Sequence, residues 1–168
     1  KTVQLKEFFG EKPVILTPVY YECPMLCTLI LNGLNQTLKE MKLTVGKEFN
    51  IVTFTIDPGE GPDLAKVKRE NYLKDYGRAE GEESWVFLSG DEATIQKLTS
   101  AVGFKFQYDE KTDEYAHAAS IQVLTPEGKI ANYFSDVMFD PKDLRLAIVE
   151  ASALKIGTAF DQFLLLCF

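Results

Sequence analysis

Strand-like and helical segments alternate along this chain, and that alternation constrains its fold more than any other feature. Runs rich in β-branched and aromatic residues, typical of buried strands, occupy residues 13–20, 49–57 and 85–90. Helical patterns follow them at residues 24–41, 62–77 and 91–103. Because alternating strands and helices pack as layers, this order predicts an α/β fold with a mostly buried central sheet.

The C-terminal third of the chain predicts a hairpin and then a last helix. The segments "SIQVL" (120–124) and "KIANYF" (129–134) flank the turn sequence "TPEG", and residues 141–154 have a helical pattern. We therefore expect a central mixed sheet flanked by helices, with a C-terminal β-hairpin and a final helix. The length of 168 residues, of which 46% are apolar, fits one domain over residues 1–168.

The charge balance argues against some classes of partner. Lys and Arg number 18 against 25 Asp and Glu, which gives a net charge of -7. Because no basic stripe is left to bind phosphates, we expect neither nucleic acid nor an anionic membrane surface as a partner. A cationic protein or a metal ion fits better, although an acidic surface more often serves solubility alone. No apolar run reaches the ~18 residues that a membrane-spanning helix needs.

The two ends of the chain carry further signals. The first residues, "KTV", are neither a start methionine nor a signal peptide, so we expect a chain trimmed at its front. The segment "FDQFLLLCF" (160–168) is strongly apolar, and we expect it to dock on the core, to meet a partner or to have been cut from a longer segment. Cys167 is the third of three cysteines and lies too near the end to be assigned to a pair.

Cys23 and Cys27 lie in "YYECPMLCT" (20–28), where the first strand-like run meets the first helix. If Pro24 is the first helical residue, both cysteines lie near the positive end of the helix dipole, which favours thiolates. Spacing of four residues on a helix places the two Cα atoms roughly 6 Å apart, within the range that a disulfide accepts. The pair can therefore exchange disulfides or hold a soft ion such as Cu(I) or Zn. The thioredoxin-like architecture carries its reactive cysteines at this same place.

The two cysteines also allow a structural interpretation. Cysteine is among the most buried residue types, and a helix that carries Leu26, Leu29 and Ile30 beside the pair could bury both thiols in an ordinary core. The junction of a strand and a helix is, however, a place where chains expose chemistry, so we favour a reactive pair. The structural role stays open.

His117 is the only histidine, and it lies in "EYAHAASIQVL" (114–124) among small residues that would let an ion come close. A single histidine is more often a surface or hydrogen-bonded residue than a metal ligand. In thioredoxin-like proteins, however, the loop before this strand faces the cysteine motif, so His117 is the candidate for a third ligand. Asp57 and Tyr21 are candidates for contacts around such a site. Asp57 is equally a turn former, and packing at the end of a strand explains Tyr21 as well.

Four sequence blocks together resemble the Sco/SenC family of thioredoxin-like copper proteins, as a divergent bacterial branch. They are "YYECPMLCT", "FTIDP" (54–58), "WVFLSGDEATIQKLTSAVGFKF" (85–106) and "HAASIQVLTPEGKIANYF" (117–134), and their order covers roughly residues 5–150. The most specific element is the three-residue gap between the cysteines that opens on Pro24, combined with the three downstream blocks.

The resemblance implies that Cys23, Cys27 and His117 bind copper, as Cu(I) or Cu(II). It implies a role in maturing the CuA centre of cytochrome c oxidase, as copper donor, thiol reductant or both. The implied partners are the oxidase subunit that carries CuA or another cuproprotein, and a thiol reductant or copper donor protein. The implied location is periplasmic with a membrane tether, and we expect the isolated domain to be a monomer.

The chain departs from the family pattern after the second strand. Family members commonly carry D-P-x-x-D-T-P, whereas this chain reads "DPGEGPD" (57–63), so Gly61 replaces an acidic residue proposed to assist copper or redox chemistry. A thiol-disulfide oxidoreductase, in which Cys23 attacks and Cys27 resolves without a metal, is the alternative to a copper metallochaperone. No arginine lies near the cysteines to hold a peroxide, which argues against a peroxidase.

Overall fold

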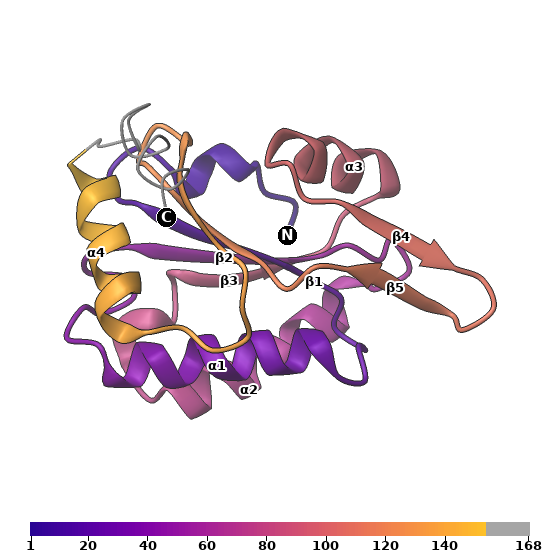
Figure 1. The fold of residues 1–168 in the computed structure, drawn as a ribbon, viewed down its shortest axis with the longest axis horizontal. Helices are drawn as coiled ribbons and strands as arrows, with labels where there is room; N and C mark the ends of the chain where they lie inside the picture. The colour runs from indigo at the N-terminus through magenta and orange to yellow at the C-terminus, as the bar shows by residue number, and fades with distance from the viewer. Residues whose placement is uncertain (154–168) are drawn as a thin grey trace, which may run out of the picture.

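The computed structural model describes residues 1–153, which form a five-stranded mixed sheet with helices on both faces (Figure 1). The strands are β1 (Val14–Val19), β2 (Asn50–Thr55), β3 (Trp85–Leu88), β6 (Ile121–Leu124) and β7 (Ile130–Phe134), in the spatial order β3-β2-β1-β6-β7. β1 to β3 are parallel, while β6 runs antiparallel to both β1 and β7. This topology confirms the predicted α/β class, the mixed sheet and the C-terminal hairpin.

Helices cover the sheet from two sides (Figure 1). α1 (Leu26–Glu40) and α2 (Pro62–Tyr76) lie on one face, and α3 (Glu92–Ala101) and the 3-10 helix η1 (Leu5–Phe8) lie on the other. The final helix α4 (Pro141–Ser152) contacts β6, β7 and α1, and η2 (Ala79–Gly81) is a short connection. None of the helices in the described part is long and apolar enough to cross a bilayer. The apolar segment 160–168 and Cys167 lie outside the described residues.

The core is centred on β1, the middle strand of the sheet, and all six of its residues are buried. Its polar member, Thr17, pairs with Thr53 of β2 through their hydroxyl oxygens at 2.6 Å. The Trp85 indole N–H donates to the Thr53 hydroxyl at 3.1 Å. These three polar groups therefore do not carry the free-energy cost of buried, unsatisfied hydrogen-bonding atoms.

Two elements differ from the sequence expectation. α1 begins at Leu26 rather than Pro24, because Met25 has φ -143° and ψ -75°, outside the helical region. Residues 106–117, to which the sequence assigned no strand, form a second sheet of β4 (Phe106–Asp109) and β5 (Glu114–His117). Each of its strands is only four residues long and mostly exposed, so the alternation in the sequence is too short to mark a half-buried strand. This hairpin projects beyond the main sheet at the end where α1 begins (Figure 1).

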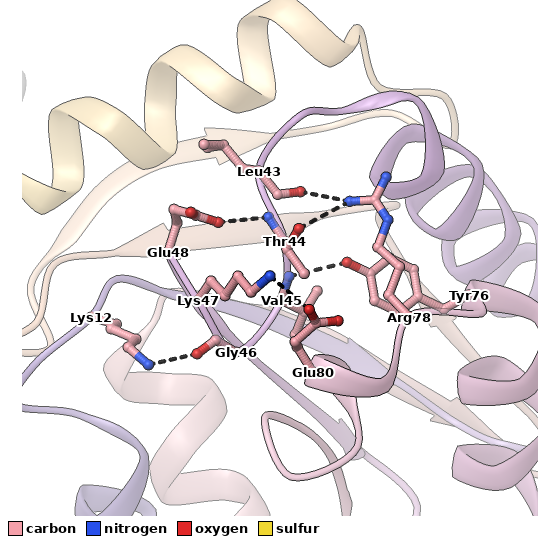
Figure 2. Close-up of polar contacts among 10 residues, drawn as sticks. All are labelled: Lys12, Leu43, Thr44, Val45, Gly46, Lys47, Glu48, Tyr76, Arg78 and Glu80. Atoms are coloured by element: carbon pink, nitrogen blue, oxygen red, sulfur yellow. Dashed lines mark hydrogen bonds and ion pairs between the residues drawn. The ribbon is translucent and has the colours of Figure 1, made fainter.

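Arg78 fixes the opposite end of α1. Its guanidinium donates to the backbone carbonyls of Lys39, Met41 and Leu43 at 2.9 to 3.0 Å. Figure 2 shows the guanidinium beside Tyr76, whose hydroxyl accepts the Val45 N–H at 3.1 Å. The last carbonyls of a helix lack partners within the helix, so a cation bound there stabilises α1. These contacts also tie α1, which carries a cysteine in its first turn, to α2.

Candidate metal and redox site

Cys27 and His117 meet at the end of the sheet where α1 begins. Cys27 lies in the first turn of α1, and His117 is the last residue of β5. The Cys27 Sγ atom is 3.1 Å from His117 Nε2. The structure therefore brings together two of the three ligands that the resemblance implied.

The hydrogen bonds of His117 define which ring nitrogen carries its proton. Nδ1 lies 3.0 Å from the carbonyl oxygen of Ala118, and a carbonyl can only accept, so Nδ1–H is the donor. Nε2 then presents its lone pair to the Cys27 sulfur. In this tautomer the ring accepts a proton from the thiol, or offers the nitrogen that a metal would bind.

Cys23 precedes α1 and lies against its first turn, with 8% of its surface exposed. Its Sγ atom accepts the Cys27 N–H at 3.3 Å, so the sulfur takes the place of an N-cap oxygen. Burial acts to raise the pKa of the Cys23 thiol, but hydrogen bonds from the Cys27 backbone, the Tyr20 side chain and the Met25 backbone outweigh it and lower that pKa. Cys23 is therefore the thiol that ionises more readily.

Cys27 has the opposite character. Only 1% of its surface is exposed, and burial raises the pKa of its thiol well above the usual range, although the Tyr20 N–H donates to Sγ at 3.3 Å. A protonated thiol is the form that donates to His117 Nε2. Both cysteines are free thiols, so the structure is that of the reduced pair.

Aromatic side chains and one carboxylate hold the histidine hairpin against the body of the protein. The rings of Tyr20 and Phe104 lie 6.1 and 5.6 Å from the imidazole ring, between centroids. Tyr115, two residues before His117, donates its hydroxyl to Asp57 Oδ1 at 3.3 Å. Asp57 also accepts the Gly59 N–H at 2.7 Å, so it is both the turn former and a contact to the histidine hairpin.

Tyr21 contacts the residues around the cysteines through its backbone N–H and not through its ring. Its ring is 2% exposed and its hydroxyl donates to the Leu88 carbonyl at 2.7 Å, away from the cysteines. Its N–H donates to the carboxylate of Glu60 at 2.7 Å. Glu60 is a residue of this site that the sequence analysis missed, because that analysis noted only the neighbouring Gly61. The signal available was an acidic residue next to the expected position.

The donor set suits a soft metal ion, but the geometry is incomplete. Two sulfurs and one imidazole nitrogen are the ligands that copper and zinc accept. Within residues 1–153, no three cysteine, histidine or carboxylate side chains are already arranged as a metal-binding group. Copper bound by Cys23, Cys27 and His117 would therefore require a local rearrangement of side chains.

Comparisons with known proteins agree with the fold and the motif order. The family model described as SCO1/SenC matches residues 1–152. No curated protein sequence matches the chain. A crystal structure from Aquifex aeolicus VF5 is 30% identical and has a TM-score of 0.74; the match covers 90% of this chain and 84% of that one.

Two more distant structures have the same thioredoxin-like fold. ScoI of Arabidopsis thaliana, solved with copper bound, is 20% identical with a TM-score of 0.69, over 92% of this chain and 91% of that one. BsSco, a member of the Sco family of cytochrome c oxidase assembly proteins in which a disulfide switch was identified, is 21% identical with a TM-score of 0.70, over 92% and 88%. The predicted thioredoxin-like fold class is thereby confirmed.

Proposed function

Because this chain belongs to the SCO1/SenC family, we propose that it is a copper metallochaperone whose cargo is bound by Cys23, Cys27 and His117. The observation that carries the proposal is the 3.1 Å contact between Cys27 Sγ and the unprotonated Nε2 of His117. A sulfur and an imidazole nitrogen from segments 90 residues apart in sequence meet there. Cys23 lies against the same helical turn and supplies the second sulfur.

The three residues have different tasks in this proposal. Cys23 ionises first and makes the initial bond to the incoming ion, because thiolates and not thiols ligate metals. Cys27 must release its proton to solvent when the metal binds, because His117 Nε2 can ligate the ion only while it stays unprotonated. Copper binding then releases protons, so copper affinity should rise with pH.

The client belongs to the proposal as well. We assign to the chain a role in maturing the CuA centre of cytochrome c oxidase, by copper delivery, by thiol reduction or by both. The description of BsSco as a cytochrome c oxidase assembly protein supports this client. A periplasmic location with a membrane tether fits it, since such a client lies in the membrane. The partner that loads the copper is a copper donor protein.

A titration with Cu(I) tests the copper proposal. We expect the reduced protein to bind one equivalent in competition with a Cu(I) chelator, and His117→Ala to weaken binding at least about tenfold. Lys111→Ala, on the exposed turn of the same hairpin, is the matched control and should bind like the wild type. An unchanged affinity of His117→Ala would remove the histidine from the site, and a wild type that binds no copper would end the proposal.

The unequal thiols favour one alternative, a thiol-disulfide oxidoreductase. The Cys23 thiolate would attack a substrate disulfide and release one substrate thiolate, and Cys27 would then attack Cys23 sulfur and release the second. The substrate gains two electrons, and the protein is left with a disulfide that a thiol reductant must reduce. Turnover that survives His117→Ala but is lost in Cys23→Ser would favour this function.

A further inference from the structure

Glu60 is a buried carboxylate whose role is not explained by the ligand set. It lies in the turn between β2 and α2, and only 5% of its surface is exposed. Acidic residues are almost never this buried unless they are paired. No ion pair within the described part of the chain involves Glu60, whose partners are hydrogen-bond donors instead.

The partners of Glu60 belong to the turn that leads into the cysteine motif. Oε2 accepts the Tyr21 N–H and Oε1 accepts the Glu22 N–H, both at 2.7 Å. The Thr55 hydroxyl, at the end of β2, donates to Oε2. Two consecutive backbone amides immediately before Cys23 are therefore held by one carboxylate from a distant segment.

This arrangement fixes the backbone that carries Cys23. The turn is closed by the Cys23 N–H, which donates to the Tyr20 carbonyl at 3.3 Å, and Glu60 binds the two amides in between. Charge-assisted hydrogen bonds to a carboxylate are roughly twice as strong as neutral ones. The Glu60 charge also acts on its surroundings: burial first, and then the charge of Glu60, raises the pKa of Tyr21.

We propose that Glu60 is a positioning residue of the copper site, which fixes the turn before Cys23 and places a buried negative charge that favours Cu(II) over Cu(I). The second part rests on the proposed function, since it concerns bound copper. When bound Cu(I) loses one electron to an electrode or mediator and becomes Cu(II), the site gains one positive charge. The Glu60 carboxylate binds the two amides immediately before Cys23 and is buried, so it is an anion close to the site with little solvent screening. Such an anion stabilises the more positive state.

Hydrogen exchange of the metal-free protein tests the positioning role. Glu60→Gln keeps the shape but leaves one acceptor oxygen and places an NH₂ group against the amides. We expect exchange at Tyr21 or Glu22 to accelerate at least about tenfold, while amides of β1 exchange as in the wild type. Glu22→Gln removes an exposed carboxylate one residue from Cys23 and should leave this exchange unchanged. Unchanged exchange in Glu60→Gln overturns the positioning role.

The midpoint potential of the Cu(II)/Cu(I) couple tests the charge. In Glu60→Gln we expect the affinity ratio of Cu(II) to Cu(I) to fall about tenfold, which raises the potential by about 59 mV for one electron. Glu60→Asp keeps the charge and should stay closer to the wild type, and Glu22→Gln, whose charge is screened by water, should shift the potential little.

The outcomes separate the two proposals. A potential in Glu60→Gln that equals that of Glu22→Gln overturns the charge role. A wild type that binds no copper overturns the proposed function, and the exchange measurement on the metal-free protein then still decides the positioning role. Should Glu60→Gln fail to fold, Glu60→Asp serves for the exchange measurement, because its shorter side chain cannot reach both amides as glutamate does.

Discussion

At the scale of single residues, the two thiols of the pair differ although they lie in one short motif. The Cys23 sulfur accepts an N–H from the first turn of α1, where the helix dipole favours negative charge. The Cys27 sulfur is more deeply buried and faces an imidazole nitrogen that accepts rather than donates. Cys23 is therefore suited to attack a disulfide or to bind an incoming metal ion first. Cys27 is suited to stay protonated until a metal ion or a disulfide reaches the site.

Alkylation kinetics should separate the two thiols. We expect iodoacetamide to modify Cys23 first at pH 7, because its pKa is lowered and thiolate persists below the usual range near 8.5. The Cys23 rate should level off at a lower pH than that of a free thiol. The Cys27 rate should keep rising with pH, because burial raises its pKa. Peptide mapping by mass spectrometry gives both rates.

The Cys23→Ser variant provides the control, since it should lose the fast phase and keep the slow one. Equal rates for both thiols across this pH range would contradict the assignment. If neither thiol reacts in the folded, reduced protein, the structural interpretation of the pair is favoured.

The residues of the site were predictable where a sequence signal was specific. The spacing of Cys23 and Cys27 and the rarity of histidine marked three candidates, and two of them lie 3.1 Å apart. Glu60 was not predictable, because a glutamate in a polar turn looks solvent-exposed until the turn before Cys23 folds over it. Its burial depends on contacts between residues 38 and 39 positions apart, which no local pattern records.

At the scale of elements, the packing of α1 depends on a close approach between its backbone and the loop that connects β7 to α4. The loop between β7 and α4 crosses the helix at Gly33, where an added Cβ would lie 1.9 Å from the carbonyl oxygen of Val137. The Thr37 hydroxyl, one turn later, donates to the Phe139 carbonyl at 2.8 Å. Glycine costs a helix interior about 1 kcal/mol relative to alanine, so its presence here is explained by packing and not by propensity.

Gly33→Ala should destabilise the protein despite the better helix former. We expect a net loss of about 1–3 kcal/mol in the free energy of unfolding, because a backbone carbonyl must move to admit the methyl group. Chemical denaturation measures it. Gly61→Ala is the matched control: nothing lies within 4 Å of its added Cβ, and its change should stay well below 1 kcal/mol. A Gly33→Ala variant at least as stable as the wild type would contradict this packing.

The helices and strands also show which parts of the fold local sequence patterns do not predict. Strands β1 to β3 and the helices that follow them were predicted because burial on one or both faces leaves a periodic apolar record. The β4–β5 hairpin was missed, since its strands are four residues long and mostly exposed, which is too short for a clear apolar pattern. The start of α1 was placed too early, because the preference of proline for the first turn of a helix does not predict the bend at Met25, whose backbone angles lie outside the helical region.

At the scale of the whole molecule, the site depends on three segments that meet at one end of the sheet. The turn before α1 carries the cysteines, the turn after β2 carries Asp57 and Glu60, and the β4–β5 hairpin carries His117. The hairpin forms its own two-stranded sheet and projects from the body, so few polar contacts set its position (Figure 1). The hydrogen bond from Tyr115 to Asp57 is one of them.

Removing that hydroxyl should weaken copper binding without loosening the fold. In Tyr115→Phe the ring that packs 5.5 Å from Tyr20 remains, while the link to Asp57 is lost, so the histidine is held less firmly. We expect a loss of about two- to tenfold in Cu(I) affinity, in line with one hydrogen bond of roughly 0.5–1.5 kcal/mol. Competition with a chelator measures the affinity, and thermal unfolding should change little.

Tyr108→Phe is the matched control, because the Tyr108 hydroxyl donates to Asp113 within the hairpin and, among residues 1–153, makes no hydrogen bond outside it. Its copper affinity should equal that of the wild type. If both variants lose affinity equally, the hairpin's own stability and not its attachment governs the site. If neither loses affinity, the contact between Cys27 and His117 is maintained by the packing of Tyr20 and Phe104 alone.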